Sequence, residues 1–514
     1  MDSVLVGIDI GTSSAKTVVL SQSGAVLGVA TYDYPVHTPK PGWAEQNPDT
    51  WVKAAQATVR AALAQSEVSR DAVAAVGLSG QMHGTVCVSV DGTPLRPAII
   101  WADQRSGAQV ERVVHQVGRE RLAEWTGNPL ATGFMLASWL WLNEHEPDVA
   151  RATRWVLLPK DYVRYRLTGE VGTEPSDAAS TSLFNPASRA WSTPLLRALD
   201  VREDLLPPVR PSAEIAGGLL PEAAEAMNLP PGTPVIFGGS DQALQALGNG
   251  VVDPGTVSST IGTGGQLFAP TDCPVIDLPK LRLHSYCHVL KDRWHVETAM
   301  LAAGLSLRWL RDEVLLGTSY GSLADTAASV PAGAEGLLFQ PYLIGERTPH
   351  MDSHARASFV GLTLRHGRAH LARAVMEGVV FGMRQGLDLM AQLGVPAQEI
   401  VASGGATKHP LWLQLQADIY GRPVRRRHAS EAAATGAAML AGMGAGLLQD
   451  AHAAIAAAVC ADDAWVMPDP ARRAAYEERY RAYCDLYPAL VDAMHRLEAD
   501  AGSLWASPGG VREH

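Results

Sequence analysis

The residues best suited to chemistry lie near the start of the printed sequence, where a carboxylate precedes a turn of glycine and hydroxyl residues. Two β-branched runs, 4–10 and 17–20, flank Gly11-Thr12-Ser13-Ser14, which is the pattern of a β-hairpin. Such a turn aims backbone N–H groups and the hydroxyls of Thr12 and Ser13 at one point, which suits phosphate oxygens. Asp9 offers the hard oxygen that Mg²⁺ prefers, and Lys16 adds a cation nearby.

A second copy of this turn strengthens the phosphate interpretation, because a short apolar strand that ends in glycine is common on its own. Residues 256–268 again run from a β-rich segment through Gly262-Thr263-Gly264-Gly265 into an apolar segment. The two turns stand 251 positions apart (262 minus 11). This spacing predicts a duplicated domain in which the two turns hold one phosphate chain from both sides.

An acid follows another strand at a position that suits a catalytic base. The apolar run 234–237 leads through a glycine pair to Asp241 and Gln242, at the start of a small-residue helix over 243–247. A side chain placed there is held rigidly and points into a cleft. Capping of the helix by Asp241 is the alternative. Its place just ahead of the second turn favours catalysis.

A third group of residues has the composition of a site for a small polar ligand. Gln81, Met82 and His83 lie in a glycine-flanked stretch between the predicted strands 73–78 and 86–90. A single histidine is more often structural, but the three together suggest a polar ligand with one apolar edge. The end of the next strand adds a flat aromatic face and two charges, a combination that suits a sugar: Trp101, Asp103 and Arg105.

The remaining pattern supplies the elements that position these residues. An amphipathic helix begins at 47–49, a long helix covers 369–393, and the region 106–200 is a helical insertion without visible chemistry. Gly404, Gly405 and Ala406 end a strand that starts at 401, where glycines let a base or ribose approach the backbone, although such pairs are frequent. The tyrosines of the last helix form a core stripe: Tyr476, Tyr480, Tyr483 and Tyr487.

Composition excludes several classes of protein. A chain of 514 residues with 47% hydrophobic residues predicts two large domains, and its net charge of −11 argues against nucleic-acid or anionic-membrane partners. The five cysteines never form a CxxC spacing, which predicts a reducing compartment and no structural metal. The start of the chain lacks a signal-peptide pattern, and the apolar run 432–448 is too short and glycine-rich for a bilayer span. We therefore expect a cytoplasmic protein.

These motifs resemble those of the FGGY carbohydrate kinases across nearly the full length of the chain. The phosphate turns are shared by a wider superfamily, whereas QMHG and GERTP are far more specific. The matching segments are GIDIGTSSAK at 7–16, SGQMHG at 79–84, LLPKDY at 157–162, SDAA at 176–179, GGSDQA at 238–243, IGTGG at 261–265, PYLIGERTPH at 341–350 and SGGATKHPLW at 403–412.

The resemblance implies an α/β fold of two ribonuclease-H-like domains of the actin/hexokinase type, with a deep interdomain cleft that closes on ATP and a ketopentose. The N-terminal domain would cover 1–250 and the C-terminal domain 251–490, with a tail over 491–514. A homodimer is a family expectation. Where many relatives carry a Pro-Lys pair before a Leu-x-Trp element, this chain has Ala137-Ser138, so any role of that lysine does not transfer.

The resemblance also implies a role for each motif residue. Asp241 matches the general base, and Asp9 the acid that holds Mg²⁺ directly or through water. Met82 and His83 match the sugar-binding pair. The hydroxyls of Thr12 and Thr263 match those on the β- and γ-phosphates. The adenosine segment corresponds to Gly404 and Gly405.

Two alternatives remain open. QMHG favours D-xylulose, giving D-xylulose 5-phosphate, but no spacing argument derives the sugar's stereochemistry, and L-ribulose, glycerol, a gluconate or a tetritol are other family substrates. The alternative of another class is a non-catalytic member, either a sugar-responsive regulator or an ATPase that acts on protein partners. Asp241 and the rim made by Trp101 and His83 speak against it, as does the lack of a separate peptide-binding or DNA-binding segment.

Overall fold

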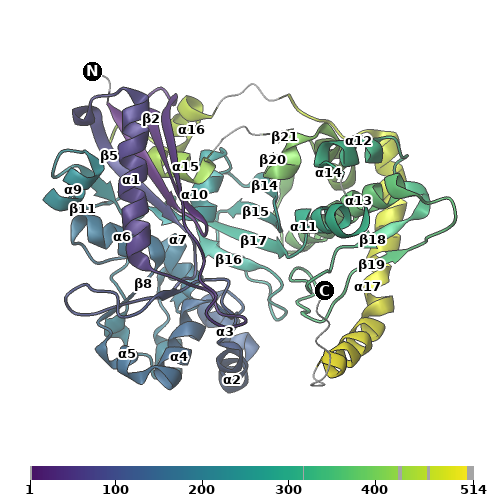
Figure 1. Cartoon of the computed structure of the whole chain (residues 1–514), viewed down its shortest axis with the longest axis horizontal. Helices are drawn as coiled ribbons and strands as arrows, with labels where there is room; N and C mark the ends of the chain where they lie inside the picture. Colours follow the sequence, from purple (N-terminus) through teal and green to yellow (C-terminus); the bar gives the residue numbers. More distant parts are fainter. Residues whose placement is uncertain (1–2, 317, 427–430, 460–463, 506–514) are drawn as a thin grey trace. The chain divides into compact units, whose positions relative to one another are not determined.

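The computed structural model describes residues 3–316, 318–426, 431–459 and 464–505 (Figure 1). The chain forms two compact units. The first comprises 1–253, 270–296 and 429–462, and the second comprises 254–269, 297–428 and 463–514. Both units are therefore discontinuous in sequence, whereas the sequence analysis placed a single boundary after residue 250. The predicted tail also begins inside a helix, since α17 runs over Pro470–Trp505.

The first unit is built on a sheet with the strand order β11-β12-β5-β1-β2-β3, in which β13 also pairs with β5. Strands β1, β2 and β3 form the antiparallel meander predicted from the sequence, whereas β5 runs parallel to β1 and both β12 and β13 run parallel to β5. The bounds are β1 Val4–Ile10, β2 Ser14–Ser21, β3 Val26–Asp33, β5 Val73–Gly80, β11 Ile215–Gly218, β12 Pro234–Ile236 and β13 Gly239–Ser240.

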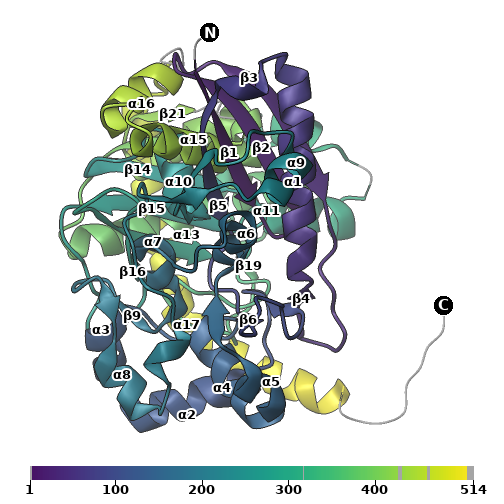
Figure 2. The same cartoon turned by 90° about the vertical axis from the view of Figure 1, so that its left-hand side faces the viewer.

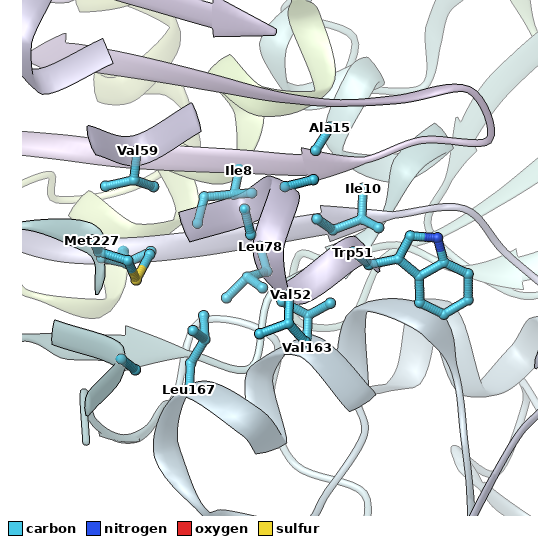
Figure 3. Close-up of a cluster of buried hydrophobic side chains, with 14 of the residues drawn as sticks. Ile8, Ile10, Ala15, Trp51, Val52, Val59, Leu78, Val163, Leu167 and Met227 are labelled. Atoms are coloured by element: carbon cyan, nitrogen blue, oxygen red, sulfur yellow. The ribbon is translucent and has the colours of Figure 1, made fainter. Parts of the chain in front are cut away.

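Helices cover both faces of this sheet because successive strand residues point to opposite faces. Helix α1 (Pro48–Ser66), capped by Asn47 as predicted, buries Trp51 and Val52 in one cluster with alternate β1 residues and with α6 (Pro159–Thr168) (Figure 3). Helix α15 (Ala432–Gly444) packs on the other face, against Leu5. Gly7 permits this approach, since a Cβ there would lie 1.9 Å from the Ala434 carbonyl oxygen.

The region between residues 106 and 200 is helical, as predicted (Figure 2). Its helices share an apolar cluster with residues that flank the region, among them Cys87, Ile99 and Leu205. Its helices are α2 Gly107–Val117, α3 Arg119–Thr126, α4 Met135–His145, α5 Pro147–Ala152, α6, α7 Pro175–Ala178, the 3₁₀ turn η2 Ala179–Thr181 and α8 Thr193–Ala198. The first unit also contains α9 Pro221–Met227, α10 Asp241–Gly248, α16 Ala451–Ala458 and the short strands β4 Glu45–Gln46, β6 Val86–Val88, β7 Ala98–Ile99, β8 Trp155–Leu157, β9 Phe184–Asn185, β10 Ala190–Trp191 and β16 His284–Cys287.

The second unit repeats the central part of this topology. Its strands follow the order β17-β15-β14-β20-β21, with β14 antiparallel to β15 and parallel to β20, as β1 is to β2 and β5. Both glycine-threonine turns therefore join the first two strands of a sheet, which confirms the two predicted hairpins. The bounds are β14 Gly255–Ile261, β15 Gly265–Thr271, β17 Trp294–Met300, β20 Ala397–Ser403 and β21 Val424–Arg426.

The helices of the second unit include the long helix predicted over 369–393. It spans Arg368–Gln392 as α13, and α17 lies along it: the hydroxyl of Tyr476 donates to Glu377 and that of Tyr480 to Asp388. The other elements are α11 Gly304–Trp309, the π-helical turn η4 Leu310–Val314, α12 Tyr320–Ala328, α14 Pro410–Tyr420, β18 Leu338–Gln340 and β19 Ser358–Val360. Across the described residues, no helix is both long and apolar enough to cross a membrane.

Candidate active site

The first glycine-threonine turn is held by side chains that bind its carbonyl groups. The N–H of Gly11 closes the turn on the Ser14 oxygen at 3.0 Å. The hydroxyl of Tyr34 donates to the Gly11 carbonyl at 2.7 Å, and Gln46 Nε2 donates to the Thr12 carbonyl at 2.7 Å. The turn therefore has a fixed backbone conformation before any ligand binds. The sequence analysis did not single out Tyr34 or Gln46, because neither belongs to a recognisable motif.

The Thr12 side chain connects the turn to two residues predicted to bind the sugar. Trp101 Nε1 donates to Thr12 Oγ1 at 2.9 Å, and Thr12 Oγ1 lies 3.4 Å from Gln81 Oε1. Gln81 is buried and donates to Gln46 Oε1 at 3.0 Å. Trp101 keeps 44% of its surface exposed. The structure thus brings together the first glycine-threonine turn, Gln81 and Trp101. The Ser13 side chain is exposed at the turn.

Asp9 lies near the end of β1, opposite Lys16 on β2. Its Oδ1 accepts a 2.7 Å hydrogen bond from the Ser79 hydroxyl. Burial raises the pKa of Asp9 above its ordinary value and outweighs the opposing effects of Ser79 and Lys16. Lys16 Nζ is itself 2.6 Å from Glu431 Oε2. The predicted phosphate cation therefore has a carboxylate partner of its own.

Asp9 fits the way in which proteins bind nucleotide-associated Mg²⁺. Among the residues that the structure describes, no cluster of three or more histidine, cysteine or acidic side chains forms a metal cage. Mg²⁺ is usually bound by one or two carboxylates together with substrate phosphates and water. A single carboxylate beside a phosphate turn meets that requirement.

The predicted sugar-binding pair follows directly after β5. Met82 is buried in an apolar cluster with Phe184 and Tyr286. His83 has a φ of 71°, a conformation that non-glycine residues seldom adopt, and its ring stacks on Phe134 at a centroid distance of 3.8 Å. Its Nδ1 lies 2.7 Å from the Ser180 carbonyl oxygen. That oxygen only accepts, so Nδ1 is the donor in this contact.

Asp241 is the first residue of α10, and Ser240 occupies the N-cap position. Asp241 Oδ1 accepts a 2.8 Å hydrogen bond from the N–H of the neighbouring Gln242, and both residues are partly exposed. Ser240 thus occupies the N-cap position without a side-chain cap, and the Asp241 carboxylate accepts from one N–H of the first helical turn.

Strand pairing gathers these groups at one edge of the first sheet. Strands β1, β5 and β13 are parallel, with Asp9 opposite Ser79 and Ser79 opposite Gly239. Because the carboxyl ends of parallel strands meet at the same edge, the residues after each strand become neighbours. That edge carries Asp9, the segment from Gln81 to His83, and Asp241.

Asp103 and Arg105 occupy a different environment from that predicted for the rim of a sugar site. Their side chains are 1% exposed and form an ion pair with an N–O distance of 2.7 Å. Arg105 also lies 2.8 Å from Glu45 Oε1 and stacks over the ring of Trp43, while Asp103 accepts from the N–H of Ala44. The charged groups of Asp103 and Arg105 are thus bound to protein partners inside the first unit.

The second unit contains a cavity of about 530 Å³ beside the second glycine-threonine turn. This volume lies in the range of sites that bind small molecules. Four of the predicted nucleotide residues line it: Gly262, Thr263, Gly405 and Ala406. The sequence analysis assigned no role to five other lining residues, which carry cationic or aromatic side chains: Arg308, Tyr320, Lys408, His409 and Trp412. Lys408, His409 and Trp412 lie in the motif at 403–412, whereas Arg308 and Tyr320 lie in none.

Backbone contacts explain how the cavity is formed. The N–H of Gly304, at the start of α11, donates to the Gly262 carbonyl at 2.9 Å, and that of Leu305 donates to the Thr263 carbonyl at 3.0 Å. The N–H of Gly262 itself closes the turn on the Gly264 oxygen at 2.9 Å. Gly404 has a φ of 83°, and a Cβ there would lie 2.5 Å from the Ile261 carbonyl oxygen. Glycine is therefore required where β20 ends beside the turn.

The GERTP motif supports the loop that precedes α11. Glu346 Oε1 accepts from the N–H groups of Leu301 at 3.1 Å and Arg347 at 2.7 Å. Burial raises the pKa of Glu346 to about 8, although both hydrogen bonds lower it. The motif thus binds the backbone close to Ala302 and Gly304, next to the second glycine-threonine turn.

Comparison with known proteins identifies the class of this chain. The N-terminal domain of the FGGY family of carbohydrate kinases matches residues 4–248, and the C-terminal domain of that family matches residues 257–445. The chain therefore belongs to the FGGY family of carbohydrate kinases. It is an ATP-dependent sugar kinase. Its α/β fold is of the actin/hexokinase type with two ribonuclease-H-like domains, as predicted.

Individual relatives extend over most of the chain. The xylulose kinase of Bacillus subtilis is 38% identical over 442 residues, which cover 86% of this chain and 88% of that protein. A gluconokinase of the same species is 32% identical over 452 residues, covering 86% of this chain and 87% of that protein. The crystal structure of a "xyloylose kinase" from Brucella ovis has a TM-score of 0.89 and 33% identity, and covers 95% of this chain and 100% of that one.

The substitution Gly405→Leu tests the cavity as the nucleotide site. A Cβ at Gly405 has no atom within 4 Å, so leucine can be accommodated by the fold but occupies space in the cavity. We expect the KM for ATP to rise about tenfold or more, equivalent to about 1.4 kcal/mol of binding, with an unchanged KM for the sugar. Steady-state kinetics measures both KM values, and a thermal unfolding curve shows whether the variant is folded.

The matched control is Gly107→Leu, at a first-unit glycine that also has open space around its Cβ. It should leave the KM for ATP unchanged. Equal ATP kinetics in Gly405→Leu and the wild type would show that the nucleotide binds elsewhere.

Proposed function

We propose that this protein transfers the γ-phosphate of ATP to D-xylulose and forms D-xylulose 5-phosphate. The observation that carries the proposal is the shared edge of β1, β5 and β13, which places Asp9, His83 and Asp241 at the ends of three parallel strands. Relatives named xylulose kinases at up to 38% identity support the choice of sugar.

In this proposal Asp241 is the general base. Its carboxylate takes the proton of the sugar's 5-hydroxyl, the resulting oxygen bonds to the γ-phosphorus, and the bond between that phosphorus and the bridging oxygen of ADP breaks. Because a carboxylate of ordinary basicity suffices when it lies within hydrogen-bond reach of the hydroxyl, the chemistry depends on position. The start of α10 supplies a fixed position for Asp241.

The remaining predicted residues bind and orient the substrates. Thr12 and Thr263, with the glycines and Ser13 beside them, bind phosphate oxygens, and the segment from Gly404 to Ala406 contacts adenosine. Met82, His83, Trp101 and Gln242 contact the sugar, and Asp103 with Arg105 supports the loop that carries Trp101. Mg²⁺ bound near Asp9 would neutralise charge that develops on the phosphates.

The sugar preference is tested by following ADP release with MgATP and a panel of acceptors: D-xylulose, L-xylulose, D- and L-ribulose, glycerol, gluconate and no sugar. We expect kcat/KM to be highest for D-xylulose and only slow ADP release without sugar. Gluconate is the strongest competitor, since a gluconokinase is among the relatives. Preference for any other acceptor would replace the proposed substrate, and sugar-independent hydrolysis at the full rate would contradict sugar phosphorylation.

Substitution of the base provides a separate test. Asp241→Ala should lower kcat by about 10²- to 10⁴-fold, the usual effect of losing a general base, while the Kd for ATP stays close to that of the wild type. Asp148→Ala is the control, because Asp148 is an exposed acid of the same unit that pairs only with Arg151 among the described residues. A kcat for Asp241→Ala equal to that of the control would rule out Asp241 as the base.

The dependence of activity on pH tests Asp9. Its raised pKa means that Asp9 takes up a proton at a higher pH than an exposed aspartate does, so kcat/KM should fall on the acid side as Asp9 becomes neutral. A metal ion competes with that proton, so higher Mg²⁺ should move this acid limb to lower pH. Profiles at two Mg²⁺ concentrations measure the shift. Binding of Mn²⁺ to the ADP complex, followed by electron paramagnetic resonance, should weaken in Asp9→Asn, and equal Mn²⁺ affinity would exclude Asp9 as a ligand.

A further inference from the structure

A short segment of the helical insertion contacts the residue before the proposed base and also the proposed sugar-binding histidine. It consists of α7 and the following turn η2, residues 175–181. Ser176 Oγ accepts a 3.0 Å hydrogen bond from the N–H of Ser240, the residue before Asp241. Ser180 Oγ accepts from the N–H of His83 at 3.2 Å, and the Ser180 carbonyl binds His83 Nδ1 at 2.7 Å. Two serines of one segment thus fix the backbone at two separate parts of the site.

The segment is itself fixed by the carboxylate of Glu174, which is fully buried. Glu174 Oε1 accepts from the Ser176 hydroxyl and the Asp177 N–H, both at 2.8 Å. Glu174 Oε2 accepts from the Ser176 N–H at 2.9 Å and the Ser212 hydroxyl at 2.6 Å. The Ser176 hydroxyl therefore donates to Glu174 and accepts from Ser240, so its orientation is set by both partners.

The buried cation of Lys160 holds the same segment through ion pairs. Lys160 Nζ lies 2.8 Å from Asp161, 3.2 Å from Asp177 and 3.5 Å from Glu174, and all four side chains are 0% exposed. A Cβ at Gly80, the last residue of β5, would lie 2.8 Å from the Lys160 Cβ. The ion cluster is thus in direct contact with the strand from which Gln81, Met82 and His83 continue.

The charges of this cluster are close to balance. Lys160 and Arg164, the latter 2.6 Å from Asp161, face three carboxylates. Burial and the neighbouring carboxylates raise the pKa of Asp177 well above its ordinary value, whereas for Asp161 the two cations overcome the effect of burial and lower the pKa. Buried ion clusters seldom stabilise a fold more than apolar packing does, but removal of one partner leaves a buried charge without compensation.

We propose that Ser176 and Ser180 are positioning residues of the phosphoryl transfer. From one rigid segment, they fix the positions of the proposed base and of the proposed sugar-binding histidine. Ser176 acts through the Ser240 N–H on the first turn of α10, and hence on Asp241. Ser180 acts on the orientation and tautomer of His83. This inference rests on the proposed function, since it assigns their roles through Asp241 and His83.

The two serines should affect different kinetic constants. Ser176→Ala leaves the Ser240 N–H without its acceptor and loosens the start of α10, so kcat should fall about tenfold with little change in the KM for the sugar. Ser180→Ala removes one of the two contacts to His83 and keeps the carbonyl contact, so the KM for the sugar and its Kd by calorimetry should rise several-fold with a smaller change in kcat.

Ser212→Ala is the matched control, because Ser212 is also a buried serine and donates to the same Glu174 oxygen as the Ser176 N–H. Within the described part of the chain, the Ser212 hydroxyl hydrogen-bonds to Glu174 and to neither Ser240 nor His83. It should shift the unfolding temperature about as much as Ser176→Ala does and leave both kinetic constants unchanged. Ser176→Thr and Ser180→Thr keep the hydroxyl and should recover most of the lost kcat and sugar affinity.

The outcomes separate this inference from the proposed function. The variants are assayed with whichever acceptor the wild-type enzyme prefers, so a different sugar does not affect the comparison. A wild-type enzyme without sugar-dependent ADP release contradicts the proposed function. An active wild type, in which Ser176→Ala and Ser180→Ala match Ser212→Ala in kcat and sugar Kd, overturns the positioning role. If Ser176→Ala does not fold, Ser176→Cys takes its place in the same comparison, because its thiol is close in size to the hydroxyl but accepts hydrogen bonds only weakly.

Discussion

The candidate site depends on the register of three parallel strands in the first unit. Asp9 pairs with Ser79, and Ser79 pairs with Gly239, so the strands β1, β5 and β13 end at the same level. A shift of one residue would turn each side chain to the other face of the sheet. The buried clusters on both faces prevent such a shift, because alternate residues of β1 pack under α1 and α15. Apolar packing thus fixes the place of the polar groups.

Polar contacts then fix the conformation of the segments that follow these strands. The carbonyls of the first turn are bound by Tyr34 and Gln46, and His83 is held in a left-handed conformation by Phe134 and Ser180. Such a backbone conformation is unfavourable for a residue with a side chain and persists only where its surroundings determine it. In the first unit, buried polar groups therefore fix the backbone of segments close to the proposed reaction. This pattern is expected of an enzyme that works by positioning its substrates.

The second unit uses a related topology for a different purpose. Its turn also joins two antiparallel strands and lies beside a parallel strand, but β20 ends in glycines next to an open cavity. Gly404 is in close contact with the backbone of Ile261, while Gly405 has open space around it. The absence of a side chain at these two adjacent positions thus has two different physical consequences. Gly404 allows strand and turn to meet, and Gly405 borders the open cavity.

The sequence by itself determined the local elements and the main motifs of this protein. The two hairpins, the helix capped by Asn47 and the long helix α13 follow from patterns that extend over neighbouring residues, and the motif residues Asp9, Gln81, His83 and Asp241 were named from such patterns. Pattern alone assigned the region 106–200 no chemistry, and it did not include Tyr34, Gln46, Arg308 or Tyr320 in the site.

Only the tertiary structure decided which of these residues meet. The contact between His83 and Ser180 joins residues 97 positions apart, and that between Ser240 and Ser176 joins residues 64 positions apart. Lys16 pairs with Glu431, and Asp103 with Arg105 forms a buried ion pair instead of an exposed rim. Periodicity and turn chemistry report on neighbours along the chain, whereas hydrogen-bond partners and burial depend on how distant segments pack. For that reason the sequence could propose the chemical groups of the candidate site, and the fold was needed to show how they are held.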